Sequence, residues 1–267
     1  MTAYIPLSVI ELALASILVV ANGVISVAYG LRLERSLAVA SLRMVLQLGI
    51  VALALKFIFA QTNPVWTLLF VTIMAVATIA EVIMRQERRL KGWRALLLSA
   101  SPAFLAGLVT TLIALLLIQP QPWYAPRFLL PILGMLVGNS LSGVALVLDT
   151  ITGAASRERR VIEARLALGA TRHQAFEDIL RRGLRTGLMP VLNGMAAAGI
   201  VSLPGMMTGQ ILAGVDPVEA AKYQIMIMFL IAGATAIGVV AGGFAAVHLL
   251  TDERHRLRLD RLTAPSE

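Results

Sequence analysis

Long apolar stretches alternate with short polar segments along most of the chain. Seven of these stretches are long enough to form helices that cross the hydrocarbon core of a bilayer, which takes about 20 apolar residues. We predict the helices at residues 5–30, 36–60, 64–84, 95–118, 128–151, 186–215 and 223–250. The pattern therefore indicates an all-α, polytopic membrane protein with about seven transmembrane helices.

The basic residues set the orientation of these helices. Most of the 23 lysines and arginines fall in four short segments, at residues 32–35, 85–94, 157–185 and 254–261. Short basic loops stay on the cytoplasmic side of a membrane. An outside N-terminus brings all four segments to that side. Because the number of crossings is odd, the C-terminus is then cytoplasmic.

Composition leaves little of the chain for a soluble domain. Hydrophobic residues make up 58% and charged residues 14%, and the mean hydropathy is +0.82, whereas soluble domains carry about 25% charged residues. We predict one transmembrane domain at residues 1–250 and a basic cytoplasmic tail at 251–267 that frays into solvent. The cytoplasmic loops account for the net charge of +8, so lipid and an acidic protein surface are expected partners and nucleic acid is not.

The longest polar segment, residues 152–185, predicts two short cytoplasmic helices that meet at Gly169. Gly169 can end the first helix by adopting positive φ, and Thr171 with Gln174 forms a capping box that starts the second. The second helix carries an apolar stripe flanked by arginines: Phe176, Ile179, Leu180 and Leu184. The stripe suits either an interfacial helix on anionic lipid or a docking element for a cytoplasmic partner.

This segment resembles a known coupling loop. The residues Glu163-Ala164-x-x-Ala167-Leu168-Gly169-Ala170-Thr171 are similar to the Glu-Ala-Ala…Gly loop of ABC-transporter permeases, although the usual following Leu-Pro is represented only by Met189-Pro190. In those permeases the short helix before the glycine inserts into a groove of the ATPase subunit. The resemblance implies that six residues couple this chain to an ATPase: Glu163, Ala164, Leu168, Gly169, Ala170 and Thr171.

A second block resembles one permease family more specifically. Residues 201–217, continuing through 220–228, are similar to the permeases of bacterial ABC-type iron exporters, a family with plant relatives linked to aluminium tolerance. The resemblance is strongest over about residues 163–235. It implies an inner-membrane permease that exports iron or a similar metal as a homodimer with two cytoplasmic ABC ATPase subunits.

ATP hydrolysis is expected on the separate ATPase subunit. The chain contains no Gly-x-x-x-x-Gly-Lys-Ser/Thr phosphate loop. We therefore expect ATP and Mg on the partner, and no catalytic residue, cofactor or enzyme activity on this chain. The absence of cysteine excludes a disulfide, a thiolate metal site and a redox motif.

The sixth predicted helix contains the main candidates for the transport path. Pro204 and Gly205 interrupt it, and backbone groups freed at membrane depth must face protein or a wet cavity. Broken helices of this kind build substrate sites in transporters. Met206, Met207 and Gln210 follow within two turns, where thioethers suit soft cations and amides suit harder ones. The alternative is that these methionines only fill space in a kinked helix.

Three charged residues on apolar helices are further candidates. Glu11 lies in the outer half of the first helix, where a carboxylate costs a few kcal/mol unless it is paired or neutral. It is predicted to pair with a basic group or to serve the cation path, and it is a candidate metal ligand with Met206, Met207 and Gln210. Arg43 and Glu81 are secondary candidates, and snorkelling towards the cytoplasm is the alternative for both.

Glycines on the fifth predicted helix indicate close helix packing. Gly134 and Gly138 match the small-x-x-x-small pattern, and Gly143 follows. Such residues let two helix backbones approach closely in a membrane.

Two other functions fit the same pattern. An ABC permease could carry an organic anion or a nucleotide sugar, recruited by Arg43 and the basic loops. An ion-gradient-driven secondary transporter could use Glu11 and Glu81 as proton carriers, and the Gly169 segment would then be a lipid-facing helix. A membrane enzyme is the least expected class, because no nucleophile or His/Cys/Asp cluster stands out in the sequence.

Overall fold

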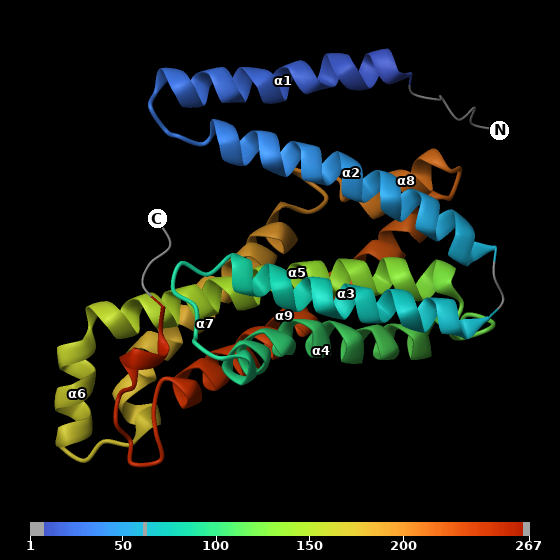
Figure 1. The fold of residues 1–267 in the computed structure, drawn as a ribbon. Helices are drawn as coiled ribbons and strands as arrows, with labels where there is room; N and C mark the ends of the chain where they lie inside the picture. Colours follow the sequence, from blue (N-terminus) through green and yellow to red (C-terminus); the bar gives the residue numbers. More distant parts are fainter. Residues whose placement is uncertain (1–7, 61–62, 264–267) are drawn as a thin grey trace. The chain divides into compact units, whose positions relative to one another are not determined.

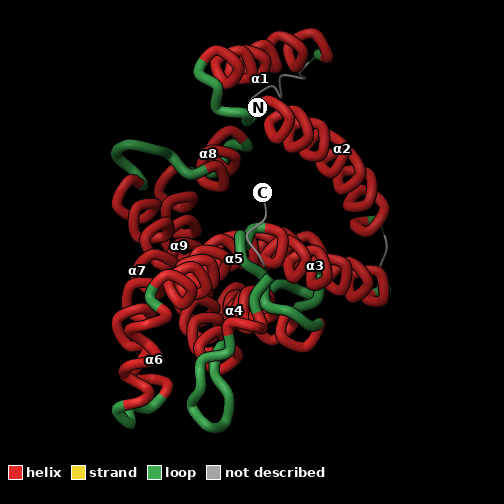
Figure 2. The backbone as a smooth tube through the Cα atoms, turned by 60° about the vertical axis from the view of Figure 1, so that its left-hand side comes forward, coloured by secondary structure: helices red, strands yellow, loops and turns green. Residues whose placement is uncertain are grey.

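The structure is a computed structural model that describes residues 8–60 and 63–263. Helices are its regular elements, and no strand is present in the described ranges (Figures 1 and 2). The helices are α1 (Val9–Ala28), α2 (Glu34–Phe59), α3 (Pro64–Met84), α4 (Trp93–Ile118), α5 (Pro126–Arg157), α6 (Arg159–Ala167), α7 (Arg172–Ala197), α8 (Gly205–Leu212), α9 (Pro217–Leu249) and a 3-10 turn (Leu259–Arg261).

Six of these helices are long and apolar enough to cross a membrane by length and composition: α1, α2, α3, α4, α5 and α9. The prediction of an all-α, polytopic membrane protein is confirmed. The seventh predicted crossing, residues 186–215, is not one continuous helix and is described below.

The chain divides into two compact units, residues 1–63 and 64–267. The first unit is the pair α1 and α2. Its connection is fixed by the buried Ser26, whose hydroxyl donates to Glu34 Oε2 at 3.0 Å and accepts from the Leu33 amide at 2.8 Å. The apolar side chains of both helices are largely exposed, as expected for helices that face lipid. That residues 1–250 act as a single domain stays a prediction.

In the second unit α4, α5 and α9 pack against one another, and α3 and α7 lie beside them. The start of α5 and the start of α9 share one apolar cluster, which contains Ile132 and Ile227. Their ends share another, which contains Ile151 and Val247. The two helices therefore run in the same direction.

A close crossing of α5 and α7 occurs at Gly143. A Cβ on Gly143 would lie 2.9 Å from the carbonyl oxygen of Gly187, too close for a real side chain. A Cβ on Gly138 would meet nothing within 4 Å, and one on Gly134 would make only an ordinary contact at 3.7 Å. Within the chain, the close approach therefore uses Gly143 and not the Gly134–Gly138 pair.

The prediction of one helix over residues 186–215 is wrong. Helix α7 starts at Arg172 and continues to Ala197, so the second short helix and the first half of the predicted crossing are one element. Residues 198–204 are not helical, and α8 follows (Figure 2). The interruption is longer than a proline kink, because Gly199 adopts a φ of +90° and redirects the chain before Pro204.

The basic segments of the second unit lie at one end of its helices. The amide of Lys91, in the loop between α3 and α4, donates to the carbonyl of Arg261 at 2.6 Å. Arg172 Nη1, at the start of α7, lies 2.8 Å from His248 Nδ1, near the end of α9. Segments 85–94, 157–185 and 254–261 therefore share one end, as the predicted topology requires. Its assignment to the cytoplasm stays a prediction.

The predicted fraying of the tail is wrong for residues 251–263, which we call the C-terminal hook. Leu262 is 6% exposed and packs in the core cluster of the second unit. The amide of Thr263 donates to the carbonyl of Arg89 at 2.8 Å. The hook is ordered because it buries leucine side chains and pairs with the α3–α4 loop. Residues 264–267 lie outside the described part of the chain.

Candidate coupling and transport sites

Helix α6 and the turn that follows it form the coupling elbow, residues 158–171. The helix is held on the second unit by Ile162, which is 1% exposed. It ends as predicted, with Gly169 at a φ of +89°. The amide of Ala170 closes the turn by donating to the carbonyl of Arg165 at 3.1 Å. Any residue with a side chain would be strained at this position.

Two ion pairs join α6 and its N-cap residue, Glu158, to α7. Arg165 Nη2 lies 2.8 Å from Asp178 Oδ2, and Arg182 Nη2 lies 2.6 Å from Glu158 Oε1. The hydrogen bond from Arg165 lowers the pKa of Asp178, and the hydrogen bond to Glu158 raises the pKa of Arg182. Together with buried Ile162, these contacts fix the orientation of α6 on α7.

The start of α7 has the predicted capping box. The Thr171 amide donates to Gln174 Oε1 at 2.9 Å, and the Gln174 amide donates to Thr171 Oγ1 at 3.4 Å. The apolar stripe beyond it is buried, with Phe176 and Ile179 in the core cluster shared with α5 and α9. The stripe therefore packs on protein and does not rest on lipid.

The opposite face of the elbow is exposed and apolar. Val161, Ala164 and Leu168 are spaced as one helical face, and Leu168 is 89% exposed. Beside them, Glu163 Oε1 accepts a hydrogen bond from Arg159 Nε at 2.8 Å. The six predicted coupling residues extend from α6 through the glycine turn to the N-cap of α7: Glu163, Ala164, Leu168, Gly169, Ala170 and Thr171. Their coupling role stays a prediction.

The other candidate region is the helix break, residues 198–204. The carbonyl of Ala197 accepts hydrogen bonds from the amides of Val201 and Ser202, at 3.0 and 3.1 Å, and the Gly199 amide donates to the Ser202 carbonyl at 2.8 Å. These bonds satisfy backbone groups that an unbroken helix would otherwise pair. Pro204 then becomes the N-cap of α8 and Gly205 its first residue.

Methionines gather beside the break. Met206 packs against the apolar cluster that contains Val191 and Ile227, and Met207 is half-buried at the next position. Residues of α5, α7 and α9 bring more thioethers to the same cluster: Met135, Met195, Met226 and Met228. The sequence pattern singled out only Met206 and Met207, because the others lie on helices far apart in the sequence.

Two buried amide oxygens on α8 and α9, helices that contribute to this cluster, have no hydrogen-bond partner in the described residues: Gln210 Oε1 and Gln224 Oε1. Gln224 is 7% exposed. A buried polar atom left unpaired costs about 1–3 kcal/mol, and a cation is one partner that would remove this cost. In the described ranges no three His, Cys, Asp or Glu side chains are grouped to hold a metal ion.

Gln224 was missed because the last helix was predicted to begin at Tyr223, which placed this amide at the membrane surface. Helix α9 begins at Pro217, with Asp216 as its N-cap, so Gln224 lies two turns inside. Asp216-Pro217 is an N-cap residue followed by a proline at N1. This pattern in the sequence predicts the observed start of α9.

The three charged candidates, Glu11, Arg43 and Glu81, lie on α1, α2 and α3. Helix α1 begins at Val9, so Glu11 lies in its first turn, where its Oε2 accepts from the Ser8 amide at 2.6 Å in a capping box. Capping accounts for this carboxylate without a cation, and its path role stays a prediction. Arg43 is exposed on α2, and Glu81 is half-buried one turn before the end of α3.

Residues 9–250 match the model of the family described as "Uncharacterised protein family (UPF0014)". The chain belongs to this family. It is 40% identical over 217 residues to a UPF0014 membrane protein of Synechocystis, which covers 79% of this chain and 82% of the relative. It is 33% identical over 252 residues to the "Probable iron export permease protein FetB" of Escherichia coli, covering 94% and 95% of the two chains.

The plant relatives extend the family. Over 232 residues the chain is 32% identical to "Protein ALUMINUM SENSITIVE 3" of Arabidopsis thaliana, covering 87% of this chain and 83% of the relative. No solved structure matches the chain. The resemblance to bacterial iron-export permeases and plant aluminium-related proteins is confirmed, and this member of UPF0014 is a multi-pass membrane protein.

Proposed function

We propose that this UPF0014 protein is the permease subunit of an ABC transporter of the inner membrane that exports iron or a similar metal ion. The observation that carries the proposal is the exposed apolar face of the coupling elbow at the basic end of the second unit. A water-exposed apolar helical face is costly unless a partner covers it. A cytoplasmic ATPase is the partner that the family resemblance supplies, with ATP and Mg bound on that subunit.

The contacts of α6 suggest how force would reach the membrane. Because two ion pairs and Ile162 fix α6 on α7, a displacement of α6 would move α7 with it. Helix α7 is continuous over 26 residues, or about 39 Å at 1.5 Å per residue. It ends at the helix break, so movement of the elbow would alter the break and the position of α8. A homodimer with two ATPase subunits would enclose the path.

The chemistry beside the break supports a metal cargo. Methionines of α5, α7, α8 and α9 pack on one apolar cluster, and α8 and α9 each carry a buried amide oxygen without a partner in the described residues, Gln210 Oε1 and Gln224 Oε1. The carbonyl end of a broken helix is partly negative and favours a cation. The printed name of the Escherichia coli relative points to iron, and we extend that cargo to this chain as part of the proposal.

Docking can be tested with a matched pair of charge reversals. Glu163 and Glu219 are both exposed carboxylates in helical ion pairs, with Arg159 and Lys222. Glu163→Lys on the elbow should reduce ATPase co-purification at least about fivefold, since the loss of one interfacial ion pair typically costs 1 kcal/mol or more. Glu219→Lys should leave it unchanged. Equal co-purification by both variants at normal membrane levels would refute docking at the elbow.

Transport can be tested in proteoliposomes with the cognate ATPase and several divalent metals. Met206→Leu combined with Gln210→Leu removes one thioether and one amide while keeping volume nearly constant, and it should reduce metal-stimulated ATP hydrolysis without loss of ATPase association. Met84→Leu, far along α3, is the matched control. If metal stimulates ATP hydrolysis by the double variant as much as by the control, Met206 and Gln210 only pack and do not bind the metal.

A further inference from the structure

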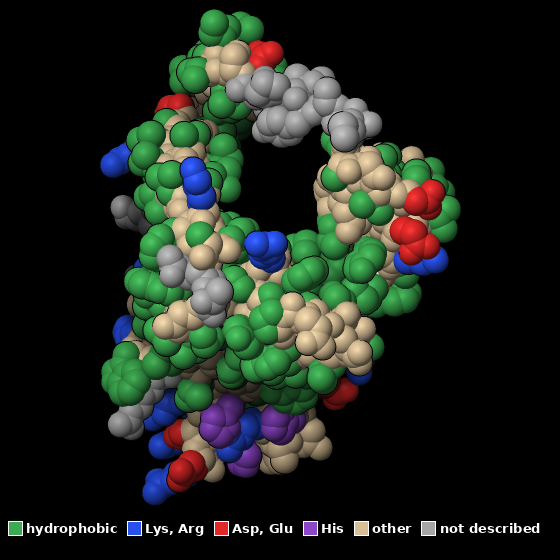
Figure 3. Space-filling model, turned by 90° about the vertical axis from the view of Figure 1, so that its right-hand side faces the viewer, with side chains coloured by type: hydrophobic (Ala, Val, Ile, Leu, Met, Phe, Trp, Pro, Cys, Tyr) green, Lys and Arg blue, Asp and Glu red, His purple; other side chains and the backbone are tan. Residues whose placement is uncertain are grey.

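A cavity of about 600 Å³ opens between the start of α7, the end of α9 and the C-terminal hook. We call it the hook pocket. Its charged lining consists of Arg172, Arg254, Arg256 and Arg261 opposed by Asp252 and Glu253, with His248 beside them. Figure 3 shows histidine, basic and acidic side chains gathered at this lower end of the second unit. The volume is ordinary for a small-molecule site.

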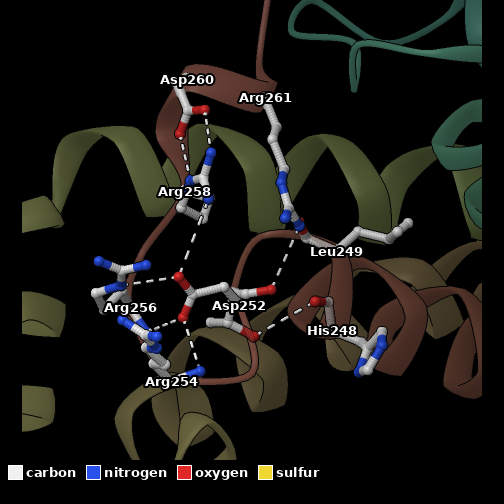
Figure 4. Close-up of polar contacts among 9 residues, drawn as sticks. His248, Leu249, Asp252, Arg254, Arg256, Arg258, Asp260 and Arg261 are labelled. Carbon is white, nitrogen blue, oxygen red and sulfur yellow. Dashed lines mark hydrogen bonds and ion pairs between the residues drawn. The ribbon is translucent and has the colours of Figure 1, made fainter.

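Asp252 is used in building the hook. Its Oδ1 accepts from the amides of Arg254 and Arg256, at 3.0 and 2.9 Å, and its Oδ2 accepts from Arg256 Nε at 2.8 Å (Figure 4). The Asp252 side chain is only 12% exposed. These bonds close the tight turn of the hook and pair Asp252 with Arg256, which leaves Arg172, Arg254 and Arg261 opposed by Glu253 in the lining of the pocket.

Two arginines are anchored with donors to spare. Arg261 Nη1 donates to the carbonyls of Leu249 and Thr251, at 2.8 and 3.4 Å, which satisfies carbonyls at the end of α9 (Figure 4). Arg172 Nη1 faces His248 Nδ1 at 2.8 Å, so this ring nitrogen is the acceptor. Because a guanidinium carries five N–H donors, each arginine uses a small part of its capacity.

Arg254 differs from its neighbours. Its guanidinium is exposed in the wall of the pocket and makes no hydrogen bond or ion pair with the described residues. Folding of the hook does not account for this charge. An unengaged guanidinium that lines the same pocket as two anchored ones offers an oxyanion free donors as well as fixed ones.

We propose that the hook pocket binds a phosphate group, carried by an anionic lipid headgroup or by a soluble phosphate compound. Arginine matches phosphate oxygens with paired, planar donors. The pocket includes Leu249, the last residue of the apolar α9, so it lies at the depth of headgroups if α9 spans the membrane. A bound phosphate would join Arg172, the first residue of α7, to the hook and so brace the junction beside the coupling elbow.

The test uses the purified full chain in detergent with two sets of probes. Pyrophosphate and Mg-free ATP represent soluble phosphate, and short-chain phosphatidylglycerol represents a lipid headgroup, with phosphatidylcholine as its reference. Calorimetric titration should show that Arg254→Gln weakens binding about tenfold, as expected for a charged hydrogen-bonding group. Arg172→Gln combined with Arg254→Gln should weaken it further. Saturation by only one set of probes identifies the source of the phosphate.

Two further variants separate a built site from general attraction. Arg181→Gln removes the same charge from a position outside the pocket and should leave binding unchanged. Glu253→Gln removes the opposing carboxylate and should tighten binding about twofold or more, because a like charge disfavours the anion. The proposal is overturned if wild type binds neither set of probes, or if Arg254→Gln and Arg181→Gln bind them equally. The Arg254 side chain makes no contact that holds the fold, and the Arg254 amide that bonds to Asp252 is kept in the Gln variant, so loss of structure cannot imitate the expected result.

Discussion

Gly143 and Gly187 set how closely α5 and α7 can approach. Each would place a Cβ within 2.9 Å of the other's carbonyl oxygen. Neither backbone can move away easily, because both helices are also packed on α9. The absence of two side chains therefore decides the spacing of three helices, whereas a Cβ on Gly134 would make only an ordinary contact and one on Gly138 would meet nothing within 4 Å.

The difference between these glycines gives a prediction for stability. Gly143→Ala should destabilise the second unit by about 1–3 kcal/mol, the usual cost of overpacking. Gly138→Ala on the same helix should have little effect, because nothing lies within 4 Å of the added methyl. Thermal unfolding in detergent compares the two. An equal midpoint for both variants would show that α5 and α7 are not held as closely as described.

Local chemistry predicted some residues well and others poorly. Gly169 and the pair Thr171 and Gln174 behave as predicted, because a positive φ and a capping box depend on neighbours within one turn. Gln224 was not predicted as a candidate because its burial depends on where α9 starts and on which helices surround it. The additional methionines were not predicted because only the packed structure shows which helices surround the cluster.

Among the elements, the C-terminal hook departs furthest from the sequence prediction. Its charge suggested a solvated tail, but Leu262 is buried, Leu257 and Leu259 are partly buried, and Asp252 and Asp260 pair with Arg256 and Arg258 within the hook. Arg258 holds Asp260 through two hydrogen bonds, at 2.9 and 2.8 Å (Figure 4). These bonds lower the pKa of Asp260 from 3.8 to about 2, and hydrogen bonds from Arg256 lower the pKa of Asp252.

The hook should therefore loosen in acid. A carboxylate with a lowered pKa stabilises the fold fully above its ordinary value of 3.8, and this contribution is lost as the pH falls towards about 2. The chain has no cysteine, so a spin label at Glu253→Cys reports only on the hook. Its spectrum should become more mobile between pH 4 and pH 2 while helix content is retained.

A double variant provides the control. Asp252→Asn combined with Asp260→Asn removes both titrating groups, so the label should be mobile already at neutral pH and should not respond to acid. A label that stays immobile in the double variant would show that leucine burial alone holds the hook.

At the scale of the whole molecule, the broken pair α7 and α8 decides the topology. Helix α7 starts beside the end of α9, where Arg172 meets His248, and its Val191 packs in one cluster with Ile227 near the start of α9. The pair can therefore serve as the predicted sixth crossing although neither helix spans alone. If it does, the coupling elbow and the start of α9 lie on opposite sides of the membrane.

Cysteine labelling tests this topology. Leu168→Cys on the elbow should react with an impermeant maleimide only from the cytoplasmic side, and Val218→Cys at the start of α9 only from outside. Both positions are well exposed, so access to the reagent is not limited by burial. Labelling of both from one side would mean that the chain turns back within the membrane after α7.

The sequence by itself determined the all-helical, multi-pass class, the shared end of the basic segments, the glycine turn of the elbow and the family. These follow from hydropathy, charge and short-range backbone preference, which act over one helix or one turn. Only the tertiary structure decided the length of the helix break, the docking of the hook, the contact at Gly143 and the burial of Gln224. Each of these depends on which distant segments meet, because burial and hydrogen-bond pairing are properties of the packed helices and not of any one of them.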